Sequence, residues 1–221
     1  MNVNDFRAAR LAMVESQLRT NTVTHPGVLA AFIELPRERF VPAGLHDSAY
    51  VDEDIALKPG RFLMEPMVLA RLVQLASIGP KDKALVIGAA TGYAAAAVAL
   101  LAQSVVAVEA DRELAAQARA NLASLHLANA TVVEGPHEQG HKPGAPYDVI
   151  LLDGAAVEIP PALSGQLAEG GRLVAVLRAR GALVGQATVL TRQGAALGRR
   201  AVFDSGTPYL PGFSPAPGFA F

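Results

Sequence analysis

The stretch from Lys83 to Glu109, KALVIGAATGYAAAAVALLAQSVVAVE, constrains the fold more than any other part of the chain. Four apolar residues, 84–87, run directly into a glycine, as expected for a strand buried on both faces of a parallel sheet. A turn of small residues leads into an alanine-rich helix over 93–102, and a second apolar strand over 105–108 ends in an acidic residue. The stretch therefore predicts the first β-α-β unit of a nucleotide-binding sheet.

The spacing of the glycines indicates which nucleotide this turn would hold. A dinucleotide fingerprint, G-x-G-x-x-G counted from Gly88, requires glycine at two positions where the chain has Ala90 and Tyr93. The G-x-G-x-G pattern of class I methyltransferases requires glycine at 88, 90 and 92, and only Ala90 departs from it, by one methyl group. Glu109 follows at about the 20-residue distance at which an acidic side chain accepts from ribose hydroxyls. This interpretation predicts S-adenosylmethionine as cofactor and requires room for its methionyl moiety beside Gly88; the alternative is that the glycines only form a tight turn.

Composition excludes several classes of protein. The chain has no cysteine, which rules out disulfides, thiolate metal sites and cysteine catalysis. Its formal net charge is −1, so no long-range field attracts nucleic acid or anionic membrane. No apolar run reaches the ~18 residues needed to span a bilayer, and the N-terminus lacks the basic-then-apolar design of a signal peptide. We expect a cytoplasmic protein that binds neither nucleic acid nor membrane; its oligomeric state stays open.

Residues 1–78 are expected to form a helical N-terminal extension that also carries a substrate loop. Asn4 is a candidate cap for a first helix, and Pro26 begins a second. The stretch 37–50 has no clear periodicity and indicates short ordered turns. Pro66 opens a third helix that is apolar on most of its surface.

Residues 79–221 are expected to form one compact α/β unit with the extension. The predicted fold is Rossmann-like, a mostly parallel seven-stranded sheet with helices on both faces. Its further elements are helices over 112–125 and 160–167 and strands over 131–134, 148–152, 172–177, 183–190 and 199–203, the last two antiparallel. Ligands of such sheets lie at the carboxyl ends of the strands, where Glu109, Gly135 and Asp153 fall. The tail from Gly206 has too many prolines and glycines for regular structure, with disorder expected beyond Ser214.

His137, Glu138 and His141 spell H-E-x-x-H, a zinc-binding pattern when it lies on a helix. Pro136 and Gly140 interrupt this segment, so two imidazoles one helical turn apart are not expected. We interpret it as a loop near the adenine edge of the sheet, with His137 placed to touch the cofactor and no metal bound.

Beyond the fold, the chain resembles the protein-L-isoaspartate O-methyltransferase family over nearly its whole length. The matching pieces are MVESQLRTNTVTHPGVLAAFIELPRERFVPAGLHDSAY, ALVIGAATGY, VVAVE, APYDVILLDGAAVEIPPAL and EGGRLVAVL. Members of that family transfer the methyl group of S-adenosylmethionine to the α-carboxyl of abnormal L-isoaspartyl residues, and the ester then cyclises so that normal aspartate is recovered. The resemblance implies this protein-repair activity, with isoaspartyl-bearing proteins or peptides as partners.

The resemblance also implies a cofactor site, and this chain departs from the family pattern at two places in it. Where the family usually has an acidic residue two before the first glycine, the chain has Val86, and where G-D-G commonly follows the third strand it has Gly135, Pro136 and His137. The implied cofactor-binding residues are Gly88, Ala89, Ala90, Gly92, Tyr93, Glu109, Ala110, Gly135, His137 and Asp153.

The larger departure lies in the substrate loop. The family pattern is close to G-Q-T-I-S-x-P, whereas residues 60–66 read GRFLMEP, so the hydroxyl groups are missing at Phe62 and Met64. Arg61 has the chemistry to grip a carboxylate and Glu65 to repel one. These four residues are the substrate-loop candidates, and no catalytic residue is assigned. The alternatives are a divergent relative that methylates another acceptor, and one that is catalytically silent and binds the cofactor or a partner.

Overall fold

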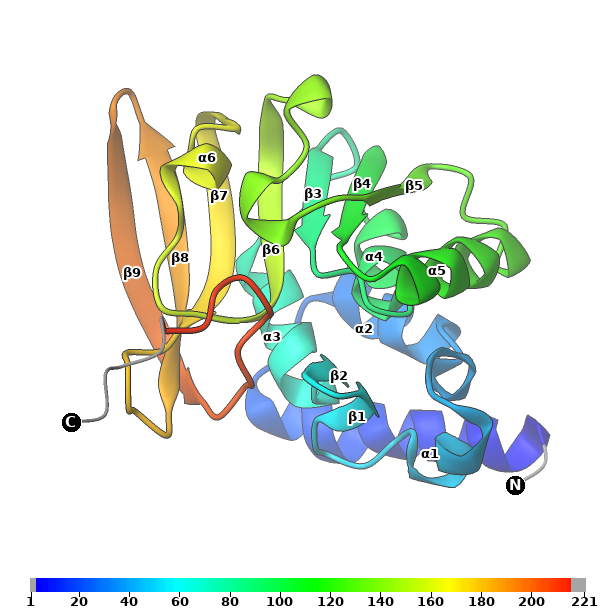
Figure 1. The fold of residues 1–221 in the computed structure, drawn as a ribbon. Coiled ribbons are helices and arrows are strands. Elements are labelled where there is room, and N and C mark those ends of the chain that lie inside the picture. Colours follow the sequence, from blue (N-terminus) through cyan, green and yellow to red (C-terminus); the bar gives the residue numbers. More distant parts are fainter. Residues whose placement is uncertain (1–2, 216–221) are drawn as a thin grey trace.

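The computed structural model describes residues 3–215 and confirms the predicted sheet (Figure 1). Its seven strands lie in the order β5-β4-β3-β6-β7-β8-β9. The first five in this order are parallel, and β8 is antiparallel to both of its neighbours. The strands are β3 (Lys83–Ile87), β4 (Ser104–Glu109), β5 (Ala130–Glu134), β6 (Tyr147–Ala156), β7 (Leu167–Leu177), β8 (Gly185–Gln193) and β9 (Ala196–Ser205).

The helices are α1 (Val3–Met13), α2 (Pro26–Glu34), α3 (Pro66–Leu75), α4 (Tyr93–Ala99), α5 (Arg112–Ser124) and α6 (Pro161–Ser164). A π-helical turn (Val14–Leu18) and a 3-10 turn (Arg19–Asn21) extend α1, and further 3-10 turns span Arg37–Phe40, Ala43–Ser48, His137–Gln139 and Lys142–Gly144. Among residues 3–215, no helix is long and apolar enough to cross a membrane.

The helix starts follow from local chemistry. Pro26 begins α2, where its missing N–H costs nothing, and the His25 ring caps the helix by accepting from the backbone of Val28 at 3.3 Å. Asp111 caps α5 with bonds to two backbone N–H groups. The prediction for Asn4 is wrong, because α1 already includes Val3 and Asn4 therefore lies inside the helix.

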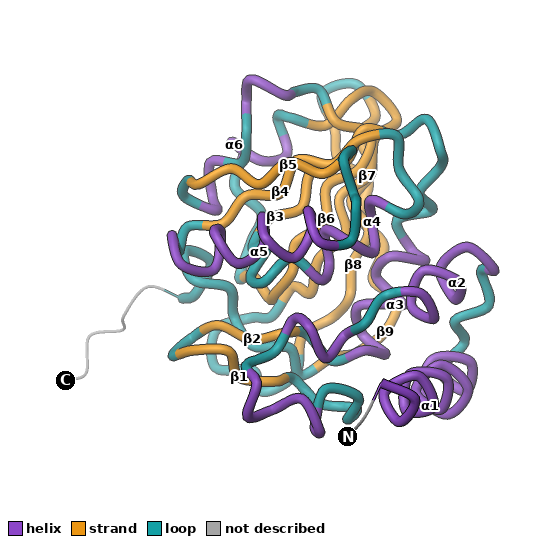
Figure 2. Tube along the Cα trace, turned by 90° about the vertical axis from the view of Figure 1, so that its right-hand side faces the viewer, coloured by secondary structure: helices purple, strands orange, loops and turns teal. Residues whose placement is uncertain are grey.

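Successive side chains of a strand point to opposite faces, so the buried sheet feeds two cores. In β3, Ala84 and Val86 join a core shared with α1 to α5, while Leu85 and Ile87 join a second core on the other face. Figure 2 shows α1, α2 and α3 grouped together beside the sheet. Helices lie on both faces, as predicted; within residues 3–215 the second core takes one helical residue, Leu163 of the single-turn α6, and is completed by Leu210 and Phe213 of the C-terminal segment.

A second local prediction is wrong. The helix predicted to reach Leu167 ends after one turn, since Leu167 already pairs with Tyr147 as the first residue of β7. The sequence did not indicate the two strands on either side of the turn at Pro59 and Gly60: β1 (Ile55–Lys58) and β2 (Arg61–Leu63) form an antiparallel hairpin. Strands of three and four residues are too short to show the alternation from which a strand is predicted. This hairpin lies below the sheet, near its carboxyl edge (Figure 1).

Arg37 connects the N-terminal extension to the rest of the molecule. Its fully buried guanidinium donates from Nε to the carbonyl of Ala49 and from Nη2 to that of Met64, both at 2.7 Å. The guanidinium carbon also lies 4.9 Å from the ring centre of Tyr93. One side chain thus binds two backbone carbonyls and packs on an aromatic ring. Because the carbonyl of Met64 belongs to the loop that follows β2, Arg37 also ties this loop to the N-terminal extension.

Replacing Arg37 should therefore destabilise the fold. We expect Arg37→Met to lower the free energy of unfolding by roughly 2–4 kcal/mol, because two buried carbonyls lose their donor. The exposed Arg39 provides a matched control, and Arg39→Met should change stability by no more than about 0.5 kcal/mol. Urea unfolding measures both, and equal shifts of the two midpoints would contradict this role for Arg37.

Candidate cofactor and acceptor site

The turn after β3 holds three residues in the left-handed region of backbone conformation. Their φ angles are 83° at Gly88, 48° at Ala90 and 98° at Gly92. Glycine is needed at 92, where a Cβ would lie 3.2 Å from the Cβ of Ala118. Ala90 carries a side chain in this strained region, and its backbone N–H donates to Oε2 of Glu109 at 2.7 Å. The turn therefore presents its backbone to the acidic residue at the end of β4.

Glu109 is fully buried and has four partners. Its Oε2 accepts from Ala90 N and, at 2.6 Å, from Nη2 of Arg61. Its Oε1 accepts from Asp111 N at 3.0 Å and lies 3.2 Å from Nε2 of His137. A carboxylate offers about four lone-pair sites; the N–H donors of Ala90, Arg61 and Asp111 fill three of them, and His137 fills the fourth when its Nε2 carries the proton.

These partners set the charge of Glu109. Burial by itself would raise its pKa, but the hydrogen bond with His137, the positive charge of Arg61 and the N–H of Asp111 outweigh burial and lower the pKa to about 2. Glu109 is therefore ionised at neutral pH, as a ribose acceptor must be to bind strongly.

Two predicted cofactor residues lie next to Glu109 without bonding its carboxylate. Gly135 donates its N–H to the backbone carbonyl of Glu109 at 3.1 Å, and Ala110 N lies 3.1 Å from Nε2 of His137. That ring nitrogen accepts from Ala110 when it carries no proton and donates to Oε1 of Glu109 when it carries one, so it makes one of these two bonds at a time. The other ring nitrogen of His137 lies 3.0 Å from the carbonyl oxygen of Pro211. His141 instead contacts the hydroxyl of Tyr147, so the two histidines of the H-E-x-x-H motif have different partners.

Tyr93, also predicted for the cofactor site, has its side chain in the core of the extension. The ring is fully buried and packs edge-on against Phe32 and Phe40, with the guanidinium of Arg37 over it. Only its backbone belongs to the glycine turn. Ala89 is likewise buried, and its N–H donates to the carbonyl of Val108 at 3.0 Å.

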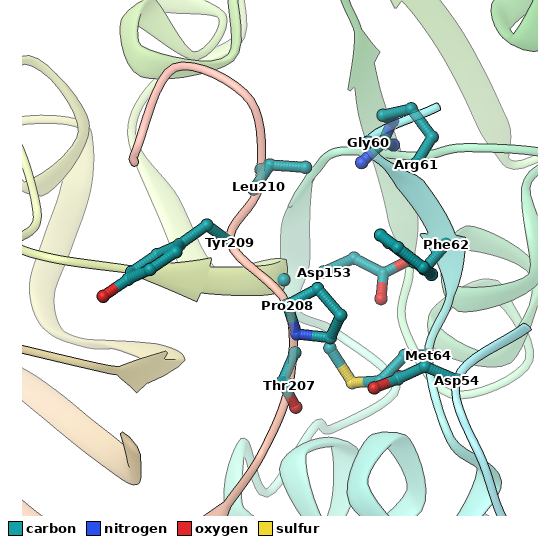
Figure 3. Close-up of a pocket in the computed structure, with 11 residues that line it drawn as sticks. Asp54, Gly60, Arg61, Phe62, Met64, Asp153, Thr207, Pro208, Tyr209 and Leu210 are labelled. Atoms are coloured by element: carbon teal, nitrogen blue, oxygen red, sulfur yellow. The ribbon is translucent and has the colours of Figure 1, made fainter. Parts of the chain in front are cut away.

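A small cavity of about 10 Å³ lies between the hairpin and the C-terminal segment (Figure 3). This volume is enough for about one water molecule. It contains three of the four substrate-loop candidates and several residues that the sequence did not indicate. Its lining consists of Asp54, Gly60, Arg61, Phe62, Met64, Asp153, Gly154, Thr207, Pro208, Tyr209 and Leu210.

Carboxylates dominate the polar lining of this cavity. Asp153 is 5% exposed, its Oδ1 has no hydrogen-bond partner among the described residues, and burial raises its pKa to about 7. Asp54 accepts from the N–H of Glu65 at 2.9 Å. Glu65 itself does not line the cavity; burial, followed by the nearby charges of Asp52 and Asp54, raises its pKa to about 7.

The C-terminal segment 206–213, which we call the strap, is bonded to the carboxyl end of β6. Leu210 donates to the carbonyl of Ala155 at 2.9 Å, and Ala155 donates to the carbonyl of Pro208 at 2.8 Å. As predicted, the strap has no regular structure, apart from one isolated bridge at Tyr209. The expected disorder beyond Ser214 falls mainly on 216–221, which lie outside the described residues.

Leu210 is 1% exposed and fills the place beside the glycine turn. A Cβ on Gly88 would lie 2.6 Å from Cδ1 of Leu210, and a Cβ on Gly154 would lie 2.8 Å from its Cβ. Sequence reasoning missed this residue, although apolar residues among the prolines and glycines of a tail are a signal for packing. Asp54 was also missed, and no local signal distinguishes it from its acidic neighbours.

Comparison with known proteins identifies the family. A family model described as Protein-L-isoaspartate(D-aspartate) O-methyltransferase matches residues 9–194. The chain is 40% identical over 173 residues to the protein-L-isoaspartate O-methyltransferase of Koribacter versatilis (strain Ellin345), a match covering 78% of each chain. It is 41% identical over 165 residues to that of Methanoregula boonei, covering 75% of this chain and 76% of the relative. The chain belongs to this family.

Solved structures of similar proteins share the fold. One protein-L-isoaspartate O-methyltransferase matches with a TM-score of 0.81 at 23% identity, covering 93% of this chain and 67% of the other. A second, from Plasmodium falciparum and in complex with S-adenosyl-L-homocysteine, matches with a TM-score of 0.75 at 17% identity, covering 91% of this chain and 97% of the other.

The residues of this isoaspartyl methyltransferase family member fit S-adenosylmethionine in chemistry. Glu109 is an ionised acceptor of the kind that ribose hydroxyls bind, and Gly88 has no side chain to keep a ligand away from the backbone. The required room beside Gly88 is taken by Leu210, which belongs to the strap and not to the sheet or a helix. Arg61 likewise occupies a hydrogen-bonding position on the Glu109 carboxylate that a ribose hydroxyl would need. The cofactor therefore fits once these two side chains move.

Glu109 should contribute stability that depends on pH. Its folded pKa of about 2 lies below the ordinary 4.5, so the stabilisation is complete above about pH 4.5 and is lost as the pH falls towards 2. We expect Glu109→Gln to cost on the order of 3 kcal/mol at pH 7 and to flatten this pH dependence. Urea unfolding at pH 7, 4 and 3 measures both effects.

Glu134 is the matched control for this experiment. It pairs in register with Glu109 on the neighbouring strand, but it is 43% exposed and its ion pair with Arg119 is at the surface. Glu134→Gln should cost less than about 1 kcal/mol. A loss at Glu109→Gln no larger than this, or one independent of pH, would show that the buried charge is not stabilising.

Leu210 should oppose the cofactor. We expect Leu210→Ala to lower stability by about 2–5 kcal/mol and yet to tighten binding of S-adenosylhomocysteine roughly tenfold or more, since less buried apolar surface must be displaced. Leu173, fully buried in the same core, is the control: Leu173→Ala should lose stability without gaining affinity. Calorimetric titration decides, and equal affinities in the two variants would contradict the expectation.

Proposed function

We propose that this protein is an S-adenosylmethionine-dependent carboxyl O-methyltransferase acting on L-isoaspartyl residues of damaged proteins or peptides. The observation that carries the proposal is the ionised, buried Glu109, held by the backbone of the glycine turn in a chain that is 40% identical to a named isoaspartyl methyltransferase over 78% of its length. The cytoplasm is the compartment we propose, because the chain contains no cysteine that an oxidising compartment would pair.

Methyl transfer to a carboxylate asks little of the protein beyond positioning. S-adenosylmethionine would supply a methyl group on a sulfonium, and an acceptor carboxylate would need no general base, so the residues here have to hold the two groups in line. Glu109 and the turn at Gly88 would hold the nucleoside side of the site, while the hairpin carrying Arg61 and Phe62 forms the acceptor side. The Glu109–Arg61 ion pair brings the two sides together.

A second candidate function keeps methyl transfer and changes the acceptor. The small cavity between the hairpin and the strap, which we call the acceptor cavity, is lined by both Asp54 and Asp153. Two carboxylates there disfavour an anionic acceptor unless a cation offsets their charge. Phe62 and Met64 supply apolar surface where the family pattern has hydroxyl groups. A neutral or cationic acceptor group would suit this lining. The charge of Arg61 in the same cavity is why we rank the isoaspartyl carboxylate first.

The direct test offers two peptides that differ only in the linkage at one aspartate. We expect methyl transfer from S-adenosylmethionine to the L-isoaspartyl peptide and not to its normal aspartyl counterpart, measured as base-labile methyl ester. Restoring the hydroxyls with Phe62→Thr and Met64→Ser should raise kcat/KM roughly tenfold or more, because each hydrogen bond to a charged group contributes about 1.5–3 kcal/mol.

Two results would argue against this function. Transfer to neither peptide by a protein that binds S-adenosylhomocysteine would favour the second candidate. Equal transfer to both peptides would show that the acceptor site does not recognise the isoaspartyl linkage.

A further inference from the structure

Arg61 belongs to both sides of the proposed site, the nucleoside side and the acceptor side. Its guanidinium is bonded to Glu109, the proposed ribose acceptor, while the residue also lines the acceptor cavity (Figure 3). We propose that Arg61 is the specificity-determining residue that binds the acceptor's carboxylate, and that a ribose freeing it from Glu109 makes it available for this role. This inference rests on the proposed function and names the residue that would recognise the substrate.

Among the contacts of Glu109, Arg61 is the partner that a ribose displaces most readily. Two of the four contacts come from the backbone N–H groups of Ala90 and Asp111, which are fixed by the turn and by the start of α5. The ring of His137 is held by further contacts to Ala110 and Pro211. Arg61 is the first residue of β2 in the two-stranded hairpin, and its guanidinium is carried by a long, flexible side chain. The free-energy cost of binding ribose hydroxyls to Glu109 is therefore lowest when they displace Arg61.

Arg61 cannot remain in this place without another anion. The side chain is 7% exposed, and its Nε already has no hydrogen-bond partner among the described residues. An unpaired buried guanidinium is strongly destabilising, so the group released from Glu109 needs a new partner. Asp153 lines the same cavity, yet its Oδ1 and the Nε of Arg61 both stay unpartnered, which shows that this arrangement does not pair them.

An incoming carboxylate satisfies this requirement once the movement of Leu210 has widened the cavity, which here holds about one water molecule. Among the described residues, Arg61 is the one cation that lines the cavity, which it shares with Asp54 and Asp153. A guanidinium binds a carboxylate with two parallel hydrogen bonds, which suits a group that must be aimed at a methyl carbon. Phe62 and Met64 offer no hydroxyl for this purpose, so the charge of Arg61 replaces hydrogen bonds that the family pattern places on its neighbours.

Binding order follows from this exchange. While Glu109 holds Arg61, a carboxylate entering the cavity meets mainly Asp54 and Asp153. After a ribose takes Glu109, the same carboxylate meets a free guanidinium. The acceptor should therefore bind well only to protein that already carries the cofactor or its product.

The experiment compares the wild-type chain with Arg61→Gln and Lys58→Gln. Lys58 is a matched control because it lies on the same hairpin and pairs with Asp111 and Glu113 outside the cavity. Binding of S-adenosylhomocysteine is measured by calorimetry. Binding of a fluorescent isoaspartyl peptide is measured by anisotropy with and without S-adenosylhomocysteine, and KM and kcat are measured with S-adenosylmethionine.

We expect the wild-type chain to bind the peptide roughly tenfold or more tightly when S-adenosylhomocysteine is present. Arg61→Gln should bind S-adenosylhomocysteine more tightly, raise KM for the peptide roughly tenfold or more with a smaller change in kcat, and lose the effect of S-adenosylhomocysteine on peptide binding. Arg61→Lys should recover part of the peptide affinity, and Lys58→Gln should behave as wild type.

Two results overturn the proposal. One is an Arg61→Gln variant that methylates the peptide with unchanged KM; the other is one that binds S-adenosylhomocysteine more weakly than wild type while remaining folded. Failure of the proposed function looks different, because then neither the wild-type chain nor any variant methylates or binds the isoaspartyl peptide. In that case the role of Arg61 as carboxylate ligand falls with it, even where the affinity for S-adenosylhomocysteine rises.

Discussion

The buried carboxylate of Glu109 is the interaction on which the site depends. It joins the glycine turn through Ala90, the start of α5 through Asp111, and the hairpin through Arg61. A charge in such a place is tolerated because hydrogen-bond donors and the cation of Arg61 surround it, which is why its pKa falls although burial opposes this. The contacts that stabilise the carboxylate are therefore also those that a nucleoside must replace.

Two segments far apart in the sequence close the site. The hairpin reaches it through Arg61, and the strap reaches it through Leu210 on the other side of the cavity (Figure 3). Arg61 supplies a charged group and Leu210 supplies apolar volume. The cofactor also has a polar part, the nucleoside, and an alkyl chain, so each side chain takes the place of one of these parts. Cofactor affinity is then a difference between ligand contacts and the contacts of these side chains, and substitutions there can raise affinity while lowering stability.

Prediction from sequence succeeded where local pattern decides structure. The strand at 84–87 and the cap at Asp111 follow from an apolar run and from a side chain that reaches its own backbone. Prediction failed at Leu167, where pairing with Tyr147 starts a strand in place of the predicted helix and tertiary pairing overrides a weak local signal. The short strands β1 and β2 were not predicted, because three or four residues show too little alternation.

The sequence by itself determined the sheet, the glycine turn and the position of Glu109 at the end of β4, because these depend on periodicity and on residues within a few turns of one another. Only the tertiary structure decided that Arg61 pairs with Glu109, 48 residues away, and that Leu210 packs on Gly88. Such contacts are set by how the hairpin and strap fold back over the carboxyl edge of the sheet. No local pattern encodes that distance, so the chemistry of the site was readable from the sequence and its closure was not.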